Sequence, residues 1–146
     1  MLALLQRVSA AEVRIAGEVV GAIGRGLLVF VCAEPGDTVE AADRLVDKVL
    51  KLRVFADPEG RMNLDVQASG GALLVVSQFT LAADTARGNR PGFSGAARPE
   101  LAIPLYERVL GTAKARGIAV ESGRFGADMQ VTLTNDGPVT IPLTIR

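Results

Sequence analysis

Apolar runs of strand length dominate this chain, and two stretches alone repeat with the period of an amphipathic helix. The first apolar helical stripe runs from Val39 to Leu50. A second helix is expected from Pro99 to Gly117, because proline favours a first helical turn and glycine favours a C-terminal cap. Strands are expected at residues 2–9, 13–15, 19–20, 27–32, 53–55, 73–76, 118–120, 129–133 and 139–145.

This order of elements predicts an α+β fold in a single domain that spans residues 1–146. The helices interrupt the strands at two separate points and do not alternate with them, which argues against a doubly wound parallel sheet. We therefore expect mostly antiparallel curved sheets or an open barrel, with two main helices packed on them. At 146 residues the chain is long enough to bury a substantial hydrophobic core, and no linker or repeat divides it.

Cap and turn residues set the expected boundaries of these elements. Asp37 or Thr38 can cap the first helix, and Asp37 stands three residues before Glu40, which is the spacing of a capping box. Pro104 falls early in the second helix and is expected to delay its start. The Asp136-Gly137-Pro138 segment is expected to form a turn between the last two strands.

The chain contains no histidine, so any chemistry here must proceed without imidazole. That excludes Ser-His and Cys-His nucleophile arrangements and the usual zinc ligand sets, and we expect neither a metal nor a cofactor. Acidic and basic residues balance at 16 each, so net charge does not signal nucleic acid binding, although a local basic patch could provide it.

The sequence also predicts the cellular compartment of the protein. No apolar run reaches the length that spans a membrane, and the first residues lack the basic segment and cleavage site of a signal peptide. Cys32 is the one cysteine and is expected to be a small core residue in a reducing environment. We therefore expect a cytoplasmic protein without a membrane partner.

The polar residues Ser77, Gln78 and Thr80 directly follow the apolar strand expected at 73–76. Gln78 can donate and accept hydrogen bonds and Thr80 offers a hydroxyl, so they could form a site at the mouth of a sheet. The same residues could instead end a strand and satisfy its backbone groups. Because no histidine can act as a base, a hydrogen-bonding role for Thr80 is easier to defend than a nucleophilic one.

Two further segments leave similar alternatives open. Gly137-Pro138 is either an ordinary turn or a rigid backbone edge, since proline fixes its φ and glycine lets a ligand approach closely. The loop at 82–97 is long enough to suggest a function. Arg87 and Arg90 lie in this loop, and Arg98 lies just beyond it. These arginines are either solvated charges or a patch that contacts phosphate.

Several segments taken together resemble the D-aminoacyl-tRNA deacylases of the bacterial and eukaryotic type. The Ser-Gln-Phe-Thr-Leu segment at 77–81 and the Asn-Asp-Gly-Pro-Val-Thr segment at 135–140 are specific as a pair, and the likeness runs essentially end to end. The other segments that carry it are Gln6 to Ser9, Gly24 with Gly26 to Val29, Met62 to Leu64, and Arg124 to Val131. One departure is Cys32, which stands where the family usually carries glycine.

The resemblance implies hydrolysis of the ester that joins a D-amino acid, or glycine mischarged on tRNA-Ala, to the 3′ end of tRNA. This is a proofreading activity that excludes L-amino acids, and the 2′-hydroxyl of the terminal adenosine is its favoured catalytic aid. It implies a homodimer with active sites at the interface, where a cis Gly137-Pro138 enters the site of the other subunit.

The resemblance also assigns roles to particular residues. Backbone N–H groups near Phe79 and Thr80 are expected to stabilise the oxyanion of the tetrahedral intermediate. The implied catalytic residues are Ser77, Gln78, Phe79 and Thr80. Arg7 is implied to support the Gly137-Pro138 loop, and Phe125 and Met129 to lie near the pocket.

A second interpretation comes from another class of protein. On the same fold, the chain could be a non-catalytic protein that binds the tRNA end or serves as an oligomeric scaffold. The intact motifs favour the hydrolase, and turnover of D- and L-aminoacyl-tRNA separates the two.

Overall fold

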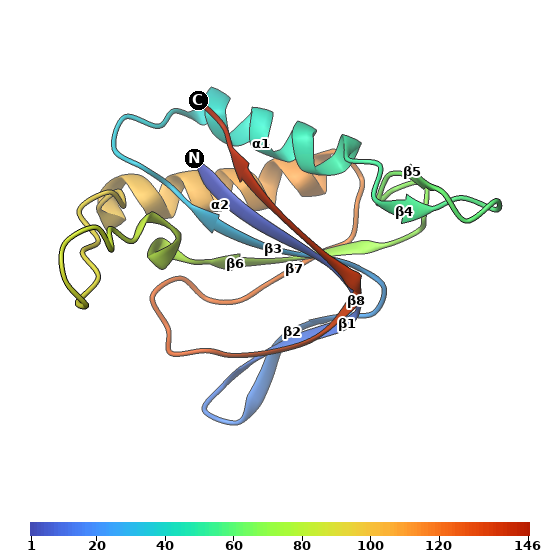
Figure 1. The fold of residues 1–146 in the computed structure, drawn as a ribbon, viewed down its shortest axis with the longest axis horizontal. Coiled ribbons are helices and arrows are strands. Elements are labelled where there is room, and N and C mark those ends of the chain that lie inside the picture. The colour runs from blue at the N-terminus through green and yellow to red at the C-terminus, as the bar shows by residue number, and fades with distance from the viewer.

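The computed structural model describes all residues from 1 to 146, and one long strand organises it. This strand, β1 (Leu2–Ile15), pairs along one edge with β3 (Gly26–Cys32) and β2 (Glu18–Ile23). Along its other edge it pairs with β8 (Gln130–Thr144), and all three pairings are antiparallel. Figure 1 shows β1 and β8 running side by side through the molecule.

Beyond β3 the main sheet continues with parallel pairs. β3 pairs with β6 (Ala72–Ser77), and β6 pairs with β7 (Val120–Ser122), which gives the order β2-β1-β3-β6-β7 with β8 on the free edge of β1. Parallel neighbours require crossover connections, and each of the two main helices lies in one. The expected α+β class is confirmed, although no pattern in the sequence indicated these two parallel pairs. A separate hairpin joins β4 (Phe55–Ala56) to β5 (Met62–Leu64).

The sheet curves until its end strands, β2 and β7, approach each other. Gly21 on β2 lies so near β7 that a Cβ atom placed there would come within 2.6 Å of the Ser122 carbonyl oxygen. A residue without a side chain is therefore required where the two backbones approach this closely. The result is a nearly closed barrel, which agrees with the curved sheets or open barrel expected from the sequence.

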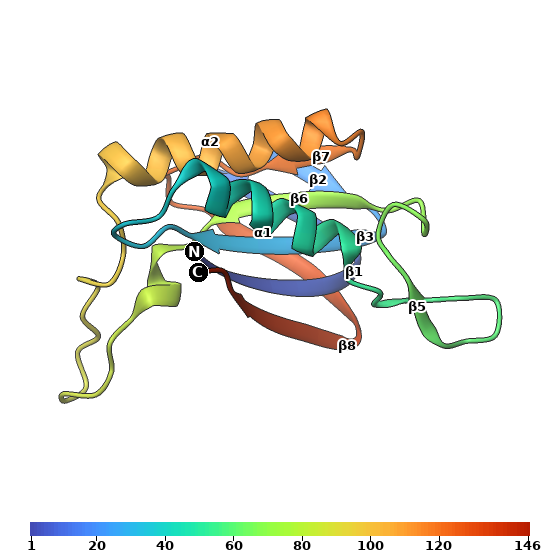
Figure 2. The ribbon, with the colours of Figure 1, turned by 90° about the horizontal axis from the view of Figure 1, so that it is seen from above.

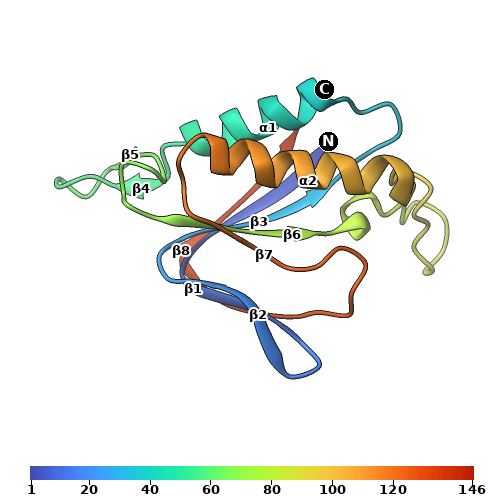
Figure 3. The same ribbon diagram turned by 180° about the vertical axis from the view of Figure 1, so that it is seen from behind.

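Both helices cover the same face of the sheet, as Figures 2 and 3 show. Helix α1 (Val39–Lys51) is capped by Thr38, whose side-chain oxygen accepts a hydrogen bond from the Ala41 amide at 3.2 Å. The capping box expected from Asp37 is wrong, because the Asp37 carboxylate has other partners. It accepts hydrogen bonds from the Glu34 amide at 2.7 Å and from the N-terminal ammonium group at 2.9 Å.

Helix α2 (Pro99–Ala115) begins at its first proline, so the expectation that Pro104 delays its start is wrong. Pro104 lies in the second turn at an exposed position, where water can satisfy the carbonyl group that loses its partner. Gly117 follows the helix with φ of 87°, as a C-terminal cap requires. No helix of the structure has the length and apolar character needed to cross a membrane.

Two hydrophobic clusters hold these layers together, and the core contains no buried polar or charged residue. The larger cluster includes residues of both helices and of the sheet, and the smaller one consists of strand residues on the opposite face of the sheet. Because side chains alternate along a strand, Val75 joins the larger cluster and Val76 joins the smaller one. The residues that follow at the end of β6 therefore point alternately towards the two faces of the sheet.

The segment at 136–138 does not form the expected turn between two strands. Instead, β8 is one element whose two halves both pair with β1. Gln6 faces Thr140 and Val8 faces Asn135, so residues 136–139 bulge outward opposite a single residue of β1. Both halves of β8 pair with the same strand, so the residues between them form a bulge. A hairpin turn would instead have produced two separate strands.

A cluster of hydrogen bonds between the helices generates a prediction about pH. Asp43 of α1 accepts bonds from Arg108 at 2.8 Å and from Thr112 at 2.8 Å, and these partners, Arg108 first, lower its pKa from 3.8 to about 2. A depressed folded-state pKa stabilises the protein above the unfolded pKa, and this contribution is lost as pH falls through about 2.

We therefore expect Asp43→Asn to lower the melting temperature at neutral pH by a few degrees. The difference from wild type should shrink as pH falls from about 4 towards about 2, because the wild-type carboxyl is then protonated. Thermal melts across this pH range measure the effect, and Glu59→Gln on the exposed β4–β5 hairpin is the control. A difference that stays constant with pH would contradict the assignment.

Candidate functional site

The polar segment at 77–80 lies where β6 ends and a short 3₁₀ helix, η1 (Phe79–Ala82), begins. The Gln78 amide makes a final bond to the Val31 carbonyl oxygen at 2.8 Å before the chain turns into η1. Inside η1 the Ala83 amide bonds to the Thr80 carbonyl oxygen at 3.1 Å. The first amides of a helix precede any partner within it, so those of Phe79 and Thr80 are available as donors.

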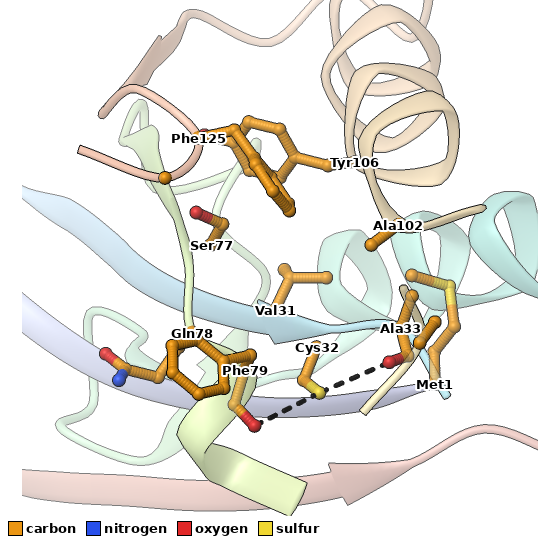
Figure 4. A pocket seen from close by; sticks show the side chains of 12 residues that line it. Met1, Val31, Cys32, Ala33, Ser77, Gln78, Phe79, Ala102, Tyr106 and Phe125 are labelled. Atoms are coloured by element: carbon orange, nitrogen blue, oxygen red, sulfur yellow. Dashed lines mark hydrogen bonds between the residues drawn. The ribbon is translucent and has the colours of Figure 1, made fainter. Parts of the chain in front are cut away.

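An apolar pocket opens beside this segment, between the ends of β3 and β6 and the first turns of α2 (Figure 4). Ser77 projects into it towards Tyr106 and Phe125, while Gln78 points to the other side of β6. The residues that line the pocket are Met1, Val31, Cys32, Ala33, Ser77, Gln78, Phe79, Ala97, Ala102, Tyr106, Phe125 and Gly126. Ser77, Gln78 and Phe79, which are three of the expected catalytic residues, thus line this pocket together with Phe125.

Gln78 and Thr80 are joined by a hydrogen bond from the Gln78 side-chain amide to the Thr80 hydroxyl oxygen. No carboxylate or other base is hydrogen-bonded to the Thr80 hydroxyl, and the residue is exposed. The arrangement can therefore orient polar groups at the pocket mouth, but it supplies no proton acceptor that would activate Thr80.

Cys32 forms part of the pocket wall, which the sequence pattern did not reveal. Its thiol is hydrogen-bonded to the carbonyl oxygens of Ala33 at 3.4 Å and Phe79 at 3.6 Å (Figure 4). Burial, followed by the charge of Glu34, raises the pKa of the thiol, so it stays protonated at neutral pH. Cys32 is therefore a neutral donor to the backbone of the 77–80 segment.

Tyr106 is a second pocket residue that the sequence did not single out, although it adjoins the apolar stripe of α2. Its hydroxyl donates a hydrogen bond to the Val75 carbonyl oxygen at 2.9 Å, and its ring lies 6.0 Å from that of Phe125. Burial raises the pKa of Tyr106 to about 12. Like Cys32, it contributes shape and a neutral hydrogen bond rather than a charge.

The Gly137-Pro138 bulge is the second expected functional segment, and side chains of β1 and β8 hold it. The Gly137–Pro138 peptide bond is cis, as the resemblance implies. Arg7 donates to the Asp136 carbonyl oxygen at 3.0 Å and to the Val54 carbonyl oxygen at 2.6 Å.

Asn135 also supports the bulge, through hydrogen bonds of its side chain. Its side chain accepts a hydrogen bond from the Val139 amide at 3.2 Å and donates one to the Thr140 hydroxyl at 2.9 Å. The Thr140 hydroxyl also accepts a bond from Gln6 at 3.2 Å. Each polar residue of the 135–140 motif thus has a partner that fixes the bulge.

Within one chain, the bulge and the pocket lie far apart. Ser77 is level with Val31 and Ala3 in the sheet, whereas the bulge is level with Arg7. The separation is roughly 13 Å along the strands and three strand spacings of about 4.8 Å across them. Met129 lies in neither place, because it packs against the smaller hydrophobic cluster.

Metal binding finds no support in this geometry. No group of three or more histidine, cysteine, aspartate or glutamate residues is arranged to hold a metal ion. A site that acts without a metal therefore stays a prediction of the sequence.

Comparison with known proteins places this arrangement in a family. The family model described as "D-Tyr-tRNA(Tyr) deacylase" matches residues 4–144, which include the pocket segment and the bulge. The chain belongs to this deacylase family. It is 63% identical over 145 residues to a D-aminoacyl-tRNA deacylase of Methylibium petroleiphilum, and the alignment covers 99% of this chain and 95% of that protein. It is 64% identical, with the same coverage, to a D-aminoacyl-tRNA deacylase of Aromatoleum aromaticum.

Solved structures show the same deacylase fold. A structure titled "c-Myc DNA Unwinding Element Binding Protein" has a TM-score of 0.95 and 39% identity, and the match covers 100% of this chain and 99% of that one. A probable eukaryotic D-amino acid tRNA deacylase has a TM-score of 0.83 with 97% of both chains covered. At 20% identity, the second structure supports the fold alone.

The support of the deacylase-family bulge by Arg7 generates a prediction. Lysine keeps the charge at this position, but it cannot bridge the Val54 and Asp136 carbonyl oxygens as the guanidinium group does. We expect Arg7→Lys to speed hydrogen exchange at the buried Val139 amide by about tenfold, because a bond from a charged donor is lost. Exchange measured by NMR tests this.

Arg14→Lys is the matched control, since Arg14 lies on the same strand and pairs with Glu12 at 3.3 Å away from the bulge. It should leave exchange at Val139 unchanged. Equal exchange in Arg7→Lys and wild type would show that Arg7 does not hold the bulge.

Proposed function

We propose that this chain hydrolyses the ester bond of D-aminoacyl-tRNA, releasing a free D-amino acid and tRNA. The observation that carries the proposal is the 77–80 segment at the mouth of an apolar pocket, in a chain that matches named deacylases over its whole length. Measuring turnover of D- and L-aminoacyl-tRNA by the purified protein tests it. Hydrolysis of the D ester with the L ester spared is the expected result.

The chemistry requires stabilisation of a developing negative charge. Water adds to the ester carbonyl carbon and gives a tetrahedral oxyanion. Its collapse breaks the bond to the ribose 3′ oxygen, which takes up the proton. The amides of Phe79 and Thr80, which have no partners within η1, are the donors proposed for the oxyanion. Losing one such donor typically costs about 10²–10³ in rate.

The proton acceptor in this proposal comes from the substrate. The chain has no histidine, Cys32 and Tyr106 have raised pKa values, and no base contacts Thr80. We assign proton transfer to the 2′-hydroxyl of the terminal adenosine, which adjoins the ester. The role of Ser77, Gln78, Phe79 and Thr80 is then to position the ester and its water.

Chirality is read by exclusion in this proposal. Gly137 and Pro138 present backbone, not a side chain, to the α-carbon of the substrate, so an L side chain strikes the wall and a D side chain points away. Glycine has no side chain to exclude, so glycine mischarged on tRNA-Ala is proposed as a further substrate. Phe125, which lines the pocket, is proposed to support it, whereas Met129 packs against the smaller hydrophobic cluster and has no role at the pocket in this proposal.

The distance between the two motifs supports the proposal of a homodimer. Because the bulge and the pocket of one chain lie far apart, the bulge can act on the ester only from a second copy. We therefore propose active sites at the interface of two identical chains. We also propose that the protein works in the cytoplasm, where its aminoacyl-tRNA substrate is used.

One alternative function has an observation in its favour. A protein 39% identical to this chain is titled "c-Myc DNA Unwinding Element Binding Protein", and that title names nucleic acid binding. The alternative is that this chain binds the tRNA end, or serves as an oligomeric scaffold, without catalysis. Such a protein would bind tRNA without turnover, so the hydrolysis assay separates the two functions.

Replacing Thr80 tests its role. We expect Thr80→Ala to keep hydrolysis within about tenfold of wild type in single-turnover assays, because it loses one neutral hydrogen bond with Gln78. Thr80→Ser, which keeps the hydroxyl, is the control. Complete loss of hydrolysis in a folded Thr80→Ala variant, or a trapped acyl adduct on Thr80, would identify the hydroxyl as a nucleophile.

Mixing two inactive variants tests the shared site. Gly137 has φ of 134°, and a Cβ atom there would lie 2.8 Å from Val139 Cγ2 and 3.0 Å from Arg7 Nη2, so Gly137→Ala should displace the bulge. Gln78→Ala removes a pocket residue. We expect each variant alone to lose most activity. Each mixed dimer should regain about half of wild-type activity through one intact composite site of two, so a random mixture, in which about half of the dimers are mixed, should regain about a quarter.

The same mixture defines what would contradict the dimer. Each variant homodimer carries its own defect at both sites, so each variant assayed alone serves as a control for the mixture. Co-expressed variants that form mixed dimers but stay inactive would rule out a composite site. A fully active monomer in light scattering would do the same.

A further inference from the structure

Two exposed aromatic side chains touch each other beside the pocket. Phe79 is 57% exposed and Phe93 is 38% exposed, and their rings meet edge to face at a centroid distance of 5.0 Å. The other large exposed hydrophobic side chains of the chain are all aliphatic. Phe79 also lines the pocket, so the pair extends the proposed site outward onto the surface.

The loop before Phe93 is held as a projecting arm, which we call the arginine arm and define as residues 84–92. The backbones of Asp84 and Gly92 exchange two hydrogen bonds, of 2.8 and 2.9 Å, which close its base. Phe93 follows directly after this closure, so the base of the arm lies at the aromatic pair. Figures 1 and 2 show the loop between η1 and α2 projecting away from the body of the molecule.

The arginine arm carries positive charge without compensating ion pairs. Arg87 and Arg90 are exposed and form no salt bridge in the structure. The one carboxylate of the arm, on Asp84, accepts a hydrogen bond from the Ala86 amide at 2.9 Å. The chain as a whole has no net charge, so this local concentration of free guanidinium groups is distinctive.

We propose that Phe93 and the arginine arm bind the unpaired nucleotides that precede the terminal adenosine of tRNA. A base stacks on Phe93, and the guanidinium groups of Arg87 and Arg90 contact the phosphates. Exposed aromatic rings next to free arginines are the combination that single-stranded nucleic acid requires. This inference rests on the proposed function, because an ester held in the pocket directs the preceding nucleotides across the Phe79–Phe93 pair.

A binding experiment tests the inference without requiring catalysis. The probes are a hairpin RNA with a single-stranded 3′ end terminating in CCA, and the same hairpin with a blunt end, both without an amino acid. We expect Phe93→Ala to weaken binding of the tailed hairpin by about tenfold, and Phe93→Tyr to restore it, as measured by fluorescence anisotropy. Binding of the blunt hairpin should be the same in all three proteins.

The arginines are tested through salt dependence. We expect Arg87→Ala and Arg90→Ala each to reduce the slope of log affinity against log salt concentration by about 0.7 for the tailed hairpin. The matched controls lie on the β4–β5 hairpin, at the opposite end of the molecule in Figure 1. Arg61→Ala removes an exposed arginine and Met62→Ala an exposed hydrophobic side chain, and both should leave binding unchanged.

Hydrolysis of D-aminoacyl-adenosine, which lacks the preceding nucleotides, checks that Phe93 acts through them. Phe93→Ala should leave its hydrolysis unchanged while raising KM for D-aminoacyl-tRNA about tenfold. Equal losses on both substrates, or equal binding of tailed and blunt hairpins by wild type and Phe93→Ala, would overturn the inference. Selective binding of the tailed hairpin without any hydrolysis would support it while rejecting the proposed catalytic function.

Discussion

Antiparallel pairing of β1 along both of its edges is the constraint on which the rest of the structure depends. One edge carries β3 and β2, and the other carries the whole of β8. Because β8 has four residues between two shared pairs where β1 has one, the excess must leave the sheet, and it does so as the Gly137-Pro138 bulge. The same register fixes where β3 and β6 end, and therefore where the pocket opens.

The pocket offers neutral groups rather than charges, which suits a site that works by shape and backbone dipoles. Burial raises the pKa of both Cys32 and Tyr106, and each donates a hydrogen bond to a backbone carbonyl oxygen. These bonds hold the backbone of β6 and η1 in place. Amide donors that are fixed in this way need little reorganisation when charge develops on a substrate, and this is how a site without histidine can stabilise an oxyanion.

The structure divides the proposed functions among separate places on the chain. We propose that the pocket segment holds the ester, that the bulge distinguishes the chirality and that the arginine arm contacts the nucleic acid. Arg7 and Asn135 hold the bulge in place, so it is already formed for the role that we propose for it. Its distance from the pocket of the same chain makes chiral selection a property of the proposed dimer rather than of the single chain.

Local pattern in the sequence indicated both main helices, most of the strand segments and the polar segment that we propose as part of the site. The stripe from Val39 to Leu50 predicted α1, and the polar residues after 73–76 predicted a site at the end of β6, because both depend on neighbours in sequence. Pairing across long separations was decided by the tertiary structure alone. No local signal states that both halves of β8 share β1, so the motif at 135–140 resembled a turn and proved to be a bulge. In the same way, Cys32 and Tyr106 became pocket walls only because β3 and α2 pack beside β6, and packing between distant elements leaves no period in the sequence.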